Sequence, residues 1–280
     1  MVRRLQILYS SQNSVVTRCE GDIVLKEYRL EMEQLIYMMN EVCISTRLNH
    51  DNIIRTLSYN INKTRFSITQ EYADGGDLVT LMSNQRVPET RTRDLMTQLL
   101  HAVDYIHDRG IIHRDIKPEN ILISKGVLKL TDFGLSIDTN MHDEREFLGT
   151  PEFMAPEMVR REQYDSAIDM WGVGCVTYEL IFGTTPFYAD TEAEIFKLIL
   201  TSTVSFPAPA SGTCISFILK LLAKDPMLRM TAKEALDSAF IGSSSSTMRR
   251  SQSFDRMSMA VAMPSRGNSV PRLKNSPCTS

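Results

Sequence analysis

Acidic, basic and amide side chains gather in one short segment of the chain, HRDIKPEN at residues 113–120. Asp115, Lys117 and Asn120 lie within it, and a further carboxylate follows at Asp132. Phosphoryl transfer needs a carboxylate near the attacking hydroxyl, cations on the phosphates and oxygen ligands for Mg²⁺. Residues of these types can supply all three, so the segment is a candidate site for that chemistry.

Two further motifs follow this segment, DFG at 132–134 and APE at 155–157. In order and spacing the three motifs resemble the HRDxxxxN, DFG and APE elements of the eukaryotic protein kinases, serine/threonine type. The resemblance covers roughly residues 5–241. It implies an α+β fold with two lobes: a small antiparallel sheet with one main helix, and a mainly helical second lobe. It also implies ATP and Mg²⁺ as cofactors.

The resemblance assigns a role to each residue of the first segment. Asp115 is expected to accept the proton of the substrate hydroxyl, while Asn120 and Asp132 hold magnesium. Lys117 resembles the lysine that serine/threonine kinases place on the transferred phosphate. Tyrosine kinases usually carry a different residue there, so Lys117 indicates serine and threonine substrates.

An ion pair is expected in the small lobe. Lys26 ends the strand-like run IVLK and resembles the lysine that binds the nucleotide phosphates. Glu41 lies nine residues before His50, which is the family's spacing for the glutamate that pairs with this lysine. An active small lobe needs this pair.

The nucleotide pocket can also be located by resemblance. The positions that match its apolar sandwich and its hinge are Val16, Val24, Leu122, Glu71 and Ala73, with Gln70 at the gatekeeper position just before the hinge. The turn that should cover the phosphates departs from the family, because Ser10 to Ser14 contains no glycine and Ser14 occupies the last glycine position. Serine keeps its backbone N–H, so we expect catalysis with altered ATP affinity. The alternative is that the turn lies too far from the phosphates to contact them, and that Lys26 and Mg²⁺ bind the phosphates without it.

Substrate choice is indicated by acidic residues and by the GTPEF segment at 149–153. Thr150 of that segment is expected to brace Asp115 and Lys117. Asp77, Glu119 and Glu179 match positions that bind arginines of the substrate in the cyclic-nucleotide-dependent and calmodulin-dependent kinases. These matches predict a preference for protein substrates with Ser/Thr near basic residues. The alternative is that they are ordinary surface acids.

Two departures concern regulation. Arg114 before Asp115 usually signals a loop ordered by phosphate, yet Glu146 occupies the usual phosphosite. A permanent carboxylate facing Arg114 predicts activity without phosphorylation, and a merely solvated acidic loop is the alternative. Four residues after Glu41, Ser45 replaces an apolar residue of the family. We expect looser packing there unless a partner or Ile44 fills the gap.

The last residues, 242–280, are rich in Ser, Arg and Pro and have no sustained apolar period, which predicts a disordered tail. Ser253 and Ser269 each follow an arginine by three residues, so they are candidate autophosphorylation sites. Pro271 after Ser269 also resembles a docking motif for a 14-3-3-type reader. A segment of this composition produces such matches readily, which is the alternative explanation.

The whole chain of 280 residues divides into a small lobe at 1–73, a large lobe at 74–241 and the tail. Strand-like runs with one helical run at 32–48 precede a helical pattern at 89–109, and Glu157 is expected to pair with Arg229. The tail carries a net +5 within a chain of −3, so residues 1–241 carry −8, which argues against a nucleic-acid-binding surface. The absence of a signal-peptide core or a membrane-spanning run predicts a protein of the cytoplasm or nucleus.

A pseudokinase scaffold is the main alternative in function. Its signature would be loss of the lysine, the base or a magnesium ligand, and this chain keeps Lys26, Asp115, Asn120 and Asp132. Only the turn without glycine and Ser45 favour it. The sequence therefore predicts an ATP-dependent protein serine/threonine kinase.

Overall fold

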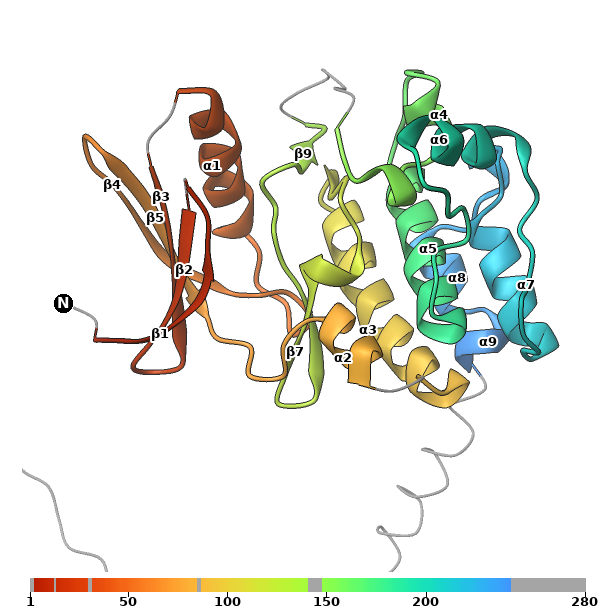
Figure 1. Ribbon diagram of the computed structural model, residues 1–280, viewed down its shortest axis with the longest axis horizontal. Helices are drawn as coiled ribbons and strands as arrows, with labels where there is room; N and C mark the ends of the chain where they lie inside the picture. Colours follow the sequence, from red (N-terminus) through yellow and green to blue (C-terminus); the bar gives the residue numbers. More distant parts are fainter. Residues whose placement is uncertain (1–2, 13, 30–31, 85–86, 141–147, 243–280) are drawn as a thin grey trace, which may run out of the picture. The chain divides into compact units, whose positions relative to one another are not determined.

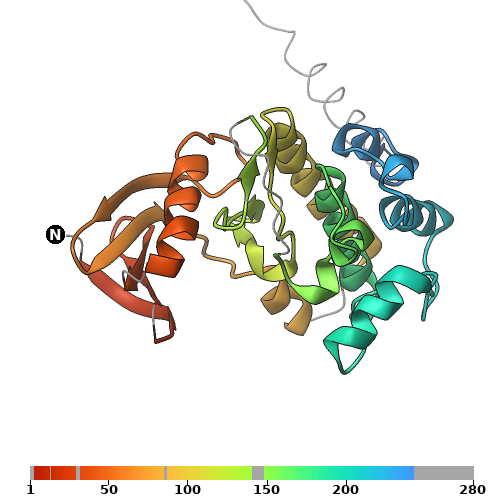
Figure 2. The same cartoon turned by 90° about the horizontal axis from the view of Figure 1, so that it is seen from above.

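The computed structural model describes residues 3–12, 14–29, 32–84, 87–140 and 148–242 of the chain. These residues form a β-sheet crossed by one helix, followed by a mainly helical part. The red and orange sheet lies at one end of the described fold and the teal and blue helices lie at the other (Figures 1 and 2). This arrangement confirms the predicted α+β fold with two lobes.

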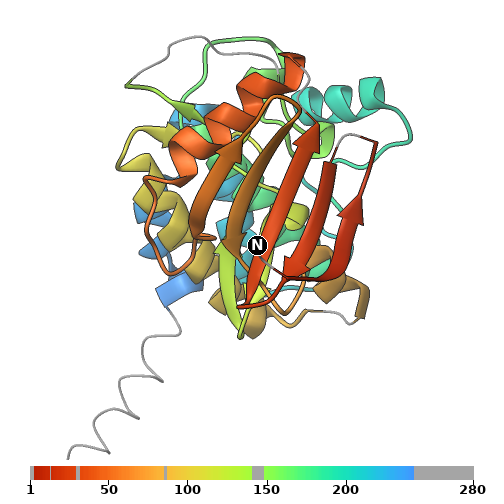
Figure 3. The same ribbon diagram turned by 90° about the vertical axis from the view of Figure 1, so that its left-hand side faces the viewer.

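The sheet has the strand order β1-β2-β3-β5-β4 and every neighbouring pair is antiparallel. Its strands are β1 (Arg4–Ser10), β2 (Ser14–Cys19), β3 (Ile23–Arg29), β4 (Thr56–Ile61) and β5 (Arg65–Glu71). Helix α1 (Met32–Ser45) crosses one face of the sheet (Figure 3). Met38 and Val42 of α1 form a small apolar core there with Phe66 and Ile68 of β5. This core fixes which face of the sheet α1 covers.

The register of the sheet directs a lysine toward α1. Lys26 of β3 lies opposite Ile68 of β5, and directly opposite residues of paired strands share one face of the sheet. Ile68 is fully buried in the core with α1. The side chain of Lys26 therefore points to the side of the sheet on which α1 lies.

The second part is built from helices and short strands. The helices are α2 (Leu78–Asn84), α3 (Glu89–His107), α4 (Pro156–Val159), α5 (Ala167–Phe182), α6 (Glu192–Thr201), α7 (Gly212–Leu221), α8 (Ala232–Leu236) and α9 (Ala239–Gly242). The short strands and 3₁₀ turns are β6 (Ile111–Ile112), η1 (Pro118–Asn120), β7 (Ile121–Ser124), β8 (Val127–Leu130), β9 (Ile137–Asp138), η2 (Pro151–Phe153) and η3 (Pro226–Leu228). Strand β6 pairs with β9, and β7 pairs with β8.

Helices α3 and α5 form the centre of the large core. The face of α3 that contains Leu95, Leu99, Val103 and Ile106 is buried, as the spacing of these residues predicts. Helix α5 is buried on nearly all sides, which is typical of a helix that other elements surround. No helix within the described residues is long and apolar enough to cross a membrane.

Capping side chains set the starts of two helices in the large lobe. Helix α7 begins at Gly212, because the side chain of Ser211 accepts a hydrogen bond from the backbone N–H of Cys214 and caps the helix. Helices α8 and α9 are short and are separated by Asp237 and Ser238. Glu234 and Thr231 form a capping box at the first of them.

The predicted ion pair of the second lobe is present and buried. Arg229 donates two hydrogen bonds to the carboxylate of Glu157, at 2.7 and 3.1 Å, and its side chain is 0% exposed. It also donates to the backbone carbonyls of Ala167 and Ala223. Removing one member of such a pair usually costs about 3–5 kcal/mol because the other charge stays buried. The pair ties the APE segment to the end of the large lobe.

Candidate active site

Asp115 lies in the loop between β6 and β7 and is the centre of a hydrogen-bonded cluster. The side-chain amide of Asn120 donates to Asp115 Oδ2 at 2.8 Å, and the hydroxyl of Thr150 donates to Oδ1 at 3.1 Å. Lys117 Nζ lies 2.8 Å from Oδ2 and donates to Thr150 Oγ1 at 2.7 Å. Asp115, Lys117 and Thr150 therefore form a closed triangle, the geometry expected from the sequence.

A buried carboxylate on α5 holds the backbone of this loop. Asp169 accepts hydrogen bonds from the N–H groups of His113 and Arg114, at 2.8 and 2.9 Å, and its Oδ2 lies 2.8 Å from His107 Nε2. Burial alone would raise the pKa of Asp169, but the bonds from His107 and the backbone hold it below its ordinary value. These bonds also offset the left-handed backbone of Arg114, whose φ is 68°.

Two oxygen donors for a cation line the cavity beside this cluster, Asn120 and Asp132. The amide nitrogen of Asn120 is used by Asp115, so the amide oxygen is the end that suits a metal. An amide oxygen and a carboxylate are hard ligands that fit Mg²⁺, which usually keeps waters and substrate phosphates as its other ligands. Within the described residues no cluster of three His, Cys, Asp or Glu side chains adds a separate metal site.

The predicted pair of the small lobe is formed. Lys26 Nζ lies 3.2 Å from Glu41 Oε1, and the two side chains are 16% and 4% exposed. Burial by itself would lower the pKa of Lys26, yet the neighbouring carboxylate of Glu41 raises that pKa above its ordinary value. Lys26 is therefore charged and faces the cavity, ready to bind phosphate.

Contacts that the sequence did not predict join α1 and the residues just after it to the DFG segment and the residues that follow DFG. The side-chain amide of Asn40 in α1 donates to the carbonyls of Gly134 and Ser136, at 3.1 and 2.6 Å. Arg47, two residues beyond the end of α1, pairs with Asp138 at 2.8 Å. These contacts hold α1 beside the loop that contains Asp132.

The cavity between the sheet and the large lobe has a volume of about 710 Å³. Its lining residues include Leu8, Tyr9, Val16, Val24, Lys26, Gln70, Glu71, Tyr72, Ala73, Asp77, Lys117, Glu119, Asn120, Leu122 and Asp132. The structure thus brings most of the predicted nucleotide, metal and substrate residues to one place. The carboxylate of Glu71 is bound by Lys129 at 2.8 Å, so its side chain serves the fold.

The turn without glycine is closed by its own serines. The backbone N–H of Ser14 donates to Ser11 Oγ at 3.1 Å, and the two hydroxyl oxygens lie 2.8 Å apart. Ser14 is not among the residues that line the cavity, whereas Tyr9 is. The N–H that a phosphate would use is therefore already engaged within the turn, and contact between Ser14 and nucleotide stays a prediction.

The predicted regulatory residues are only partly described. Glu146, Ser253 and Ser269 lie outside the described residues. Arg114 is described, and its guanidinium donates to the backbone carbonyl of Leu135 and to the hydroxyl of Tyr164. Sequence patterns gave no indication of the contact with Tyr164.

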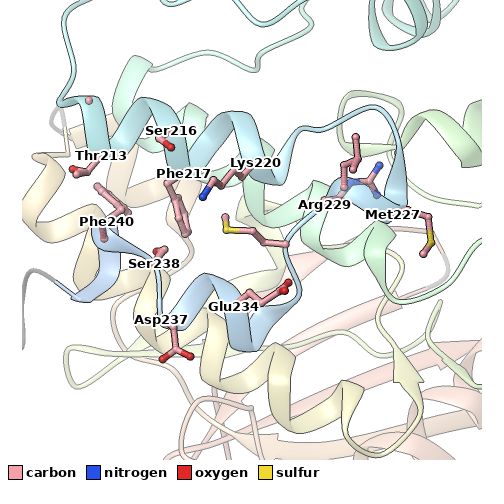
Figure 4. A pocket seen from close by; sticks show the side chains of 14 residues that line it. Thr213, Ser216, Phe217, Lys220, Met227, Arg229, Glu234, Asp237, Ser238 and Phe240 are labelled. Carbon is pink, nitrogen blue, oxygen red and sulfur yellow. The ribbon is translucent and has the colours of Figure 1, made fainter.

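A second cavity of about 650 Å³ lies between α7, η3, α8 and α9 (Figure 4). Two of its charged residues are used by the fold: Glu234 caps α8 through Thr231, and Arg229 pairs with Glu157. This cavity does not contain any member of the Asp115 cluster.

Comparison with known proteins indicates the same class of protein as the geometry of the site. The family model of the protein kinase domain matches residues 14–241, and the chain belongs to this family. It is 38% identical over 213 residues to serine/threonine-protein kinase 36 of Pongo abelii, covering 75% of this chain and 16% of that protein. It is 34% identical over 216 residues to Aurora kinase C of Mus musculus, covering 76% and 78%. It is 35% identical over 213 residues to RAC-beta serine/threonine-protein kinase A of Xenopus laevis, covering 74% of this chain and 44% of that protein.

The chain spans a small part of several relatives, 16% of serine/threonine-protein kinase 36 and 15% of serine/threonine-protein kinase TIO of Arabidopsis thaliana. Members of the protein kinase family generally use ATP and Mg²⁺. The side-chain oxygens of Asn120 and Asp132 suit Mg²⁺, and the ammonium group of Lys26 suits the phosphates of ATP.

Replacing both turn serines by glycine is expected to tighten nucleotide binding. In Ser11→Gly/Ser14→Gly the N–H at position 14 loses its acceptor within the turn and becomes available to phosphate. We expect the dissociation constant of Mg-ATP, measured by isothermal titration calorimetry, to fall about threefold to tenfold. Ser58→Gly, an exposed change elsewhere in the sheet, is the control. An unchanged dissociation constant in the double variant would show that the turn does not contact the phosphates of the nucleotide.

Proposed function

We propose that this chain is a protein serine/threonine kinase that transfers the γ-phosphoryl group of ATP to hydroxyls of protein substrates. The observation that carries the proposal is the triangle of Asp115, Lys117 and Thr150 at the edge of a cavity that Lys26 also lines. Asp115 accepts the proton of the attacking hydroxyl. Lys117 neutralises charge on the transferred phosphoryl group, and Thr150 fixes the direction of both side chains.

The remaining residues of the cavity bind and orient the nucleotide. Lys26, held by Glu41, binds the phosphates, and Asn120 and Asp132 would hold the Mg²⁺ that neutralises charge between them. Val16, Val24 and Leu122 supply apolar walls for a flat base. A pseudokinase scaffold is favoured only by the engaged N–H of Ser14, because each charged group of the site is present.

Phosphoryl transfer itself is tested by removing a metal ligand. Asp132→Asn is expected to lower the incorporation of radiolabelled phosphate from ATP into a serine peptide at least about a hundredfold. Asp94→Asn on the exposed side of α3 is the matched control and should retain wild-type transfer. Wild-type protein that transfers no phosphate above the level of Asp132→Asn would support the scaffold instead.

Preference for arginine near the target hydroxyl is the finer part of the proposal, and Glu179 supports it. Its Oε2 atom is buried and has no hydrogen-bond partner among the described residues. Burial, together with the carboxylates of Glu119 and Glu152, raises the pKa of Glu179 to about 7. An arginine of the substrate would supply the missing cation to this group of three acids. Glu152 was not among the residues predicted from the sequence.

Asp77 fits better the alternative that it is an ordinary surface acid and does not bind arginine. One of its carboxylate oxygens accepts hydrogen bonds from the N–H and the hydroxyl of Thr80, both at 2.7 Å, and so caps α2. We therefore assign arginine binding chiefly to Glu119, Glu152 and Glu179.

The pKa of Glu179 predicts a pH dependence with a definite sign. Because that pKa is raised to about 7, Glu179 is largely neutral at pH 6 and charged at pH 8, and only the charged form attracts arginine. The KM of an arginine-containing peptide should fall about fivefold between pH 6 and pH 8. The same peptide with alanine in place of arginine is the control, and Glu179→Gln should remove the difference between the two. Equal pH dependence of both peptides in wild type would contradict arginine binding by Glu179.

Activity without phosphorylation is a further part of the proposal. Arg114 supports it, because its guanidinium donates hydrogen bonds to two neutral groups, the carbonyl of Leu135 and the hydroxyl of Tyr164. These hydrogen bonds form without a phosphate. Glu146 would add a permanent negative charge, worth about 0–1 kcal/mol if exposed. Glu146→Ala is expected to lower the turnover of unphosphorylated protein about twofold to fivefold, with Glu162→Ala as the control. Unchanged turnover in Glu146→Ala would remove this role.

A further inference from the structure

Three polar side chains form a continuous hydrogen-bonded line between the nucleotide cavity and helix α1. The side-chain amide of Gln70, which lines the cavity, donates to Thr56 Oγ1 at 3.2 Å. The hydroxyl of Thr56 in turn donates to Ser45 Oγ on α1 at 2.9 Å. Gln70 and Ser45 are 3% and 1% exposed, so this line lies inside the protein.

The line depends on an irregularity of the sheet. Thr56 of β4 lies opposite Gln70 of β5, and the register shifts between Thr56 and Ser58. From Leu57 onward every residue of β4 is exposed, Leu57 at 48%, while Thr56 is partly buried and faces α1. The one residue of β4 that is not exposed is therefore polar, and it meets the equally polar Ser45.

The two hydrogen bonds of the line run in the same direction, from Gln70 to Thr56 and from Thr56 to Ser45. Gln70 donates, Thr56 accepts and donates, and Ser45 accepts, which is the arrangement in which neighbouring hydrogen bonds strengthen each other. Loss of the middle hydroxyl would leave an amide and a hydroxyl buried without these bonds. Such unpaired groups are costly inside a protein, so the line favours one placement of α1 against β4.

The position of Ser45 on α1 relates this line to the site. Ser45 is four residues after Glu41, and residues four apart lie on the same face of a helix. Whatever fixes the distance of Ser45 from the sheet also fixes the distance of Glu41 from Lys26. Asn40 of α1, and Arg47 two residues beyond its end, contact the DFG segment and the residues that follow it. Among the described residues, the line through Thr56 and the ion pair of Lys26 with Glu41 are the polar side-chain contacts between α1 and the sheet.

We propose that Thr56 is a positioning residue for phosphoryl transfer: through Ser45 and Gln70 it holds α1 where Glu41 meets Lys26. The sequence led us to expect loose packing at Ser45. In the structure the site is filled by hydrogen bonds instead. This inference rests on the proposed kinase function for its effect on turnover, but the effect on α1 itself does not depend on that function.

The test compares three single variants in the full chain. Thr56→Val keeps the shape of the side chain and removes its hydroxyl. Thr56→Ser keeps the hydroxyl, and Thr69→Val makes the same change as the first variant at a neighbouring position of β5 outside the line. Each is measured for kcat, for the KM of a serine peptide, and for amide hydrogen exchange of residues 32–45 by mass spectrometry.

We expect Thr56→Val to lower kcat about tenfold, to leave the peptide KM within about twofold, and to speed exchange in α1. Thr56→Ser and Thr69→Val should behave as wild type. Wild-type kcat and exchange in Thr56→Val would overturn the proposal, and so would a fall in kcat without faster exchange in α1. If Thr56→Val does not fold, Ser45→Ala removes the same bond from the helix side and is judged by the same two results. If wild type transfers no phosphate, the proposed function fails, and exchange in α1 alone decides the role of Thr56.

Discussion

The ion pair between Lys26 and Glu41 is the interaction on which the arrangement of the site depends. Lys26 belongs to the sheet and Glu41 to α1, so the pair exists only while the helix lies at one distance from the strand. The apolar core under α1 that contains Met38 and Val42 is small, and apolar contacts alone set such a distance loosely. The hydrogen bonds that Asn40 donates and the one that Ser45 accepts are directional, so they restrict the position of α1 more closely than the apolar core does.

Buried carboxylates elsewhere in the protein separate into two kinds. Asp169 and Glu157 are fully supplied with donors, and each ties distant parts of the chain together. Glu179 keeps a buried oxygen without a hydrogen bond among the described residues, and its pKa rises to about 7. Because a buried acid without a donor is costly, the first two stabilise the fold and the third suits a cationic ligand.

Sequence patterns predicted the residues whose types are dictated by chemistry. Asp115, Lys117 and Asn120 could be recognised because motifs of fixed spacing carry them, and the paired Lys26 and Glu41 followed from the same resemblance. Asn40, Thr56 and Tyr164 could not be predicted, since a single polar residue in a helix, strand or loop has no local signature. Their contacts depend on a strand register and on segments far apart in the chain. Ser45 was recognised as a departure, but its partner on β4 becomes evident only from the register shift after Thr56.

We infer that the pair of Lys26 and Glu41 makes the cavity competent for phosphoryl transfer. The most direct measurement is kcat of Glu41→Gln for transfer from ATP to a serine peptide, beside Glu27→Gln on the opposite face of the same sheet, where Glu27 pairs with Arg4 and Arg65. We expect Glu41→Gln to lower kcat about a hundredfold, because Lys26 loses the charge that holds it, while Glu27→Gln retains wild-type turnover. A Glu41→Gln protein with kcat within about twofold of wild type would show that phosphoryl transfer does not depend on the pair.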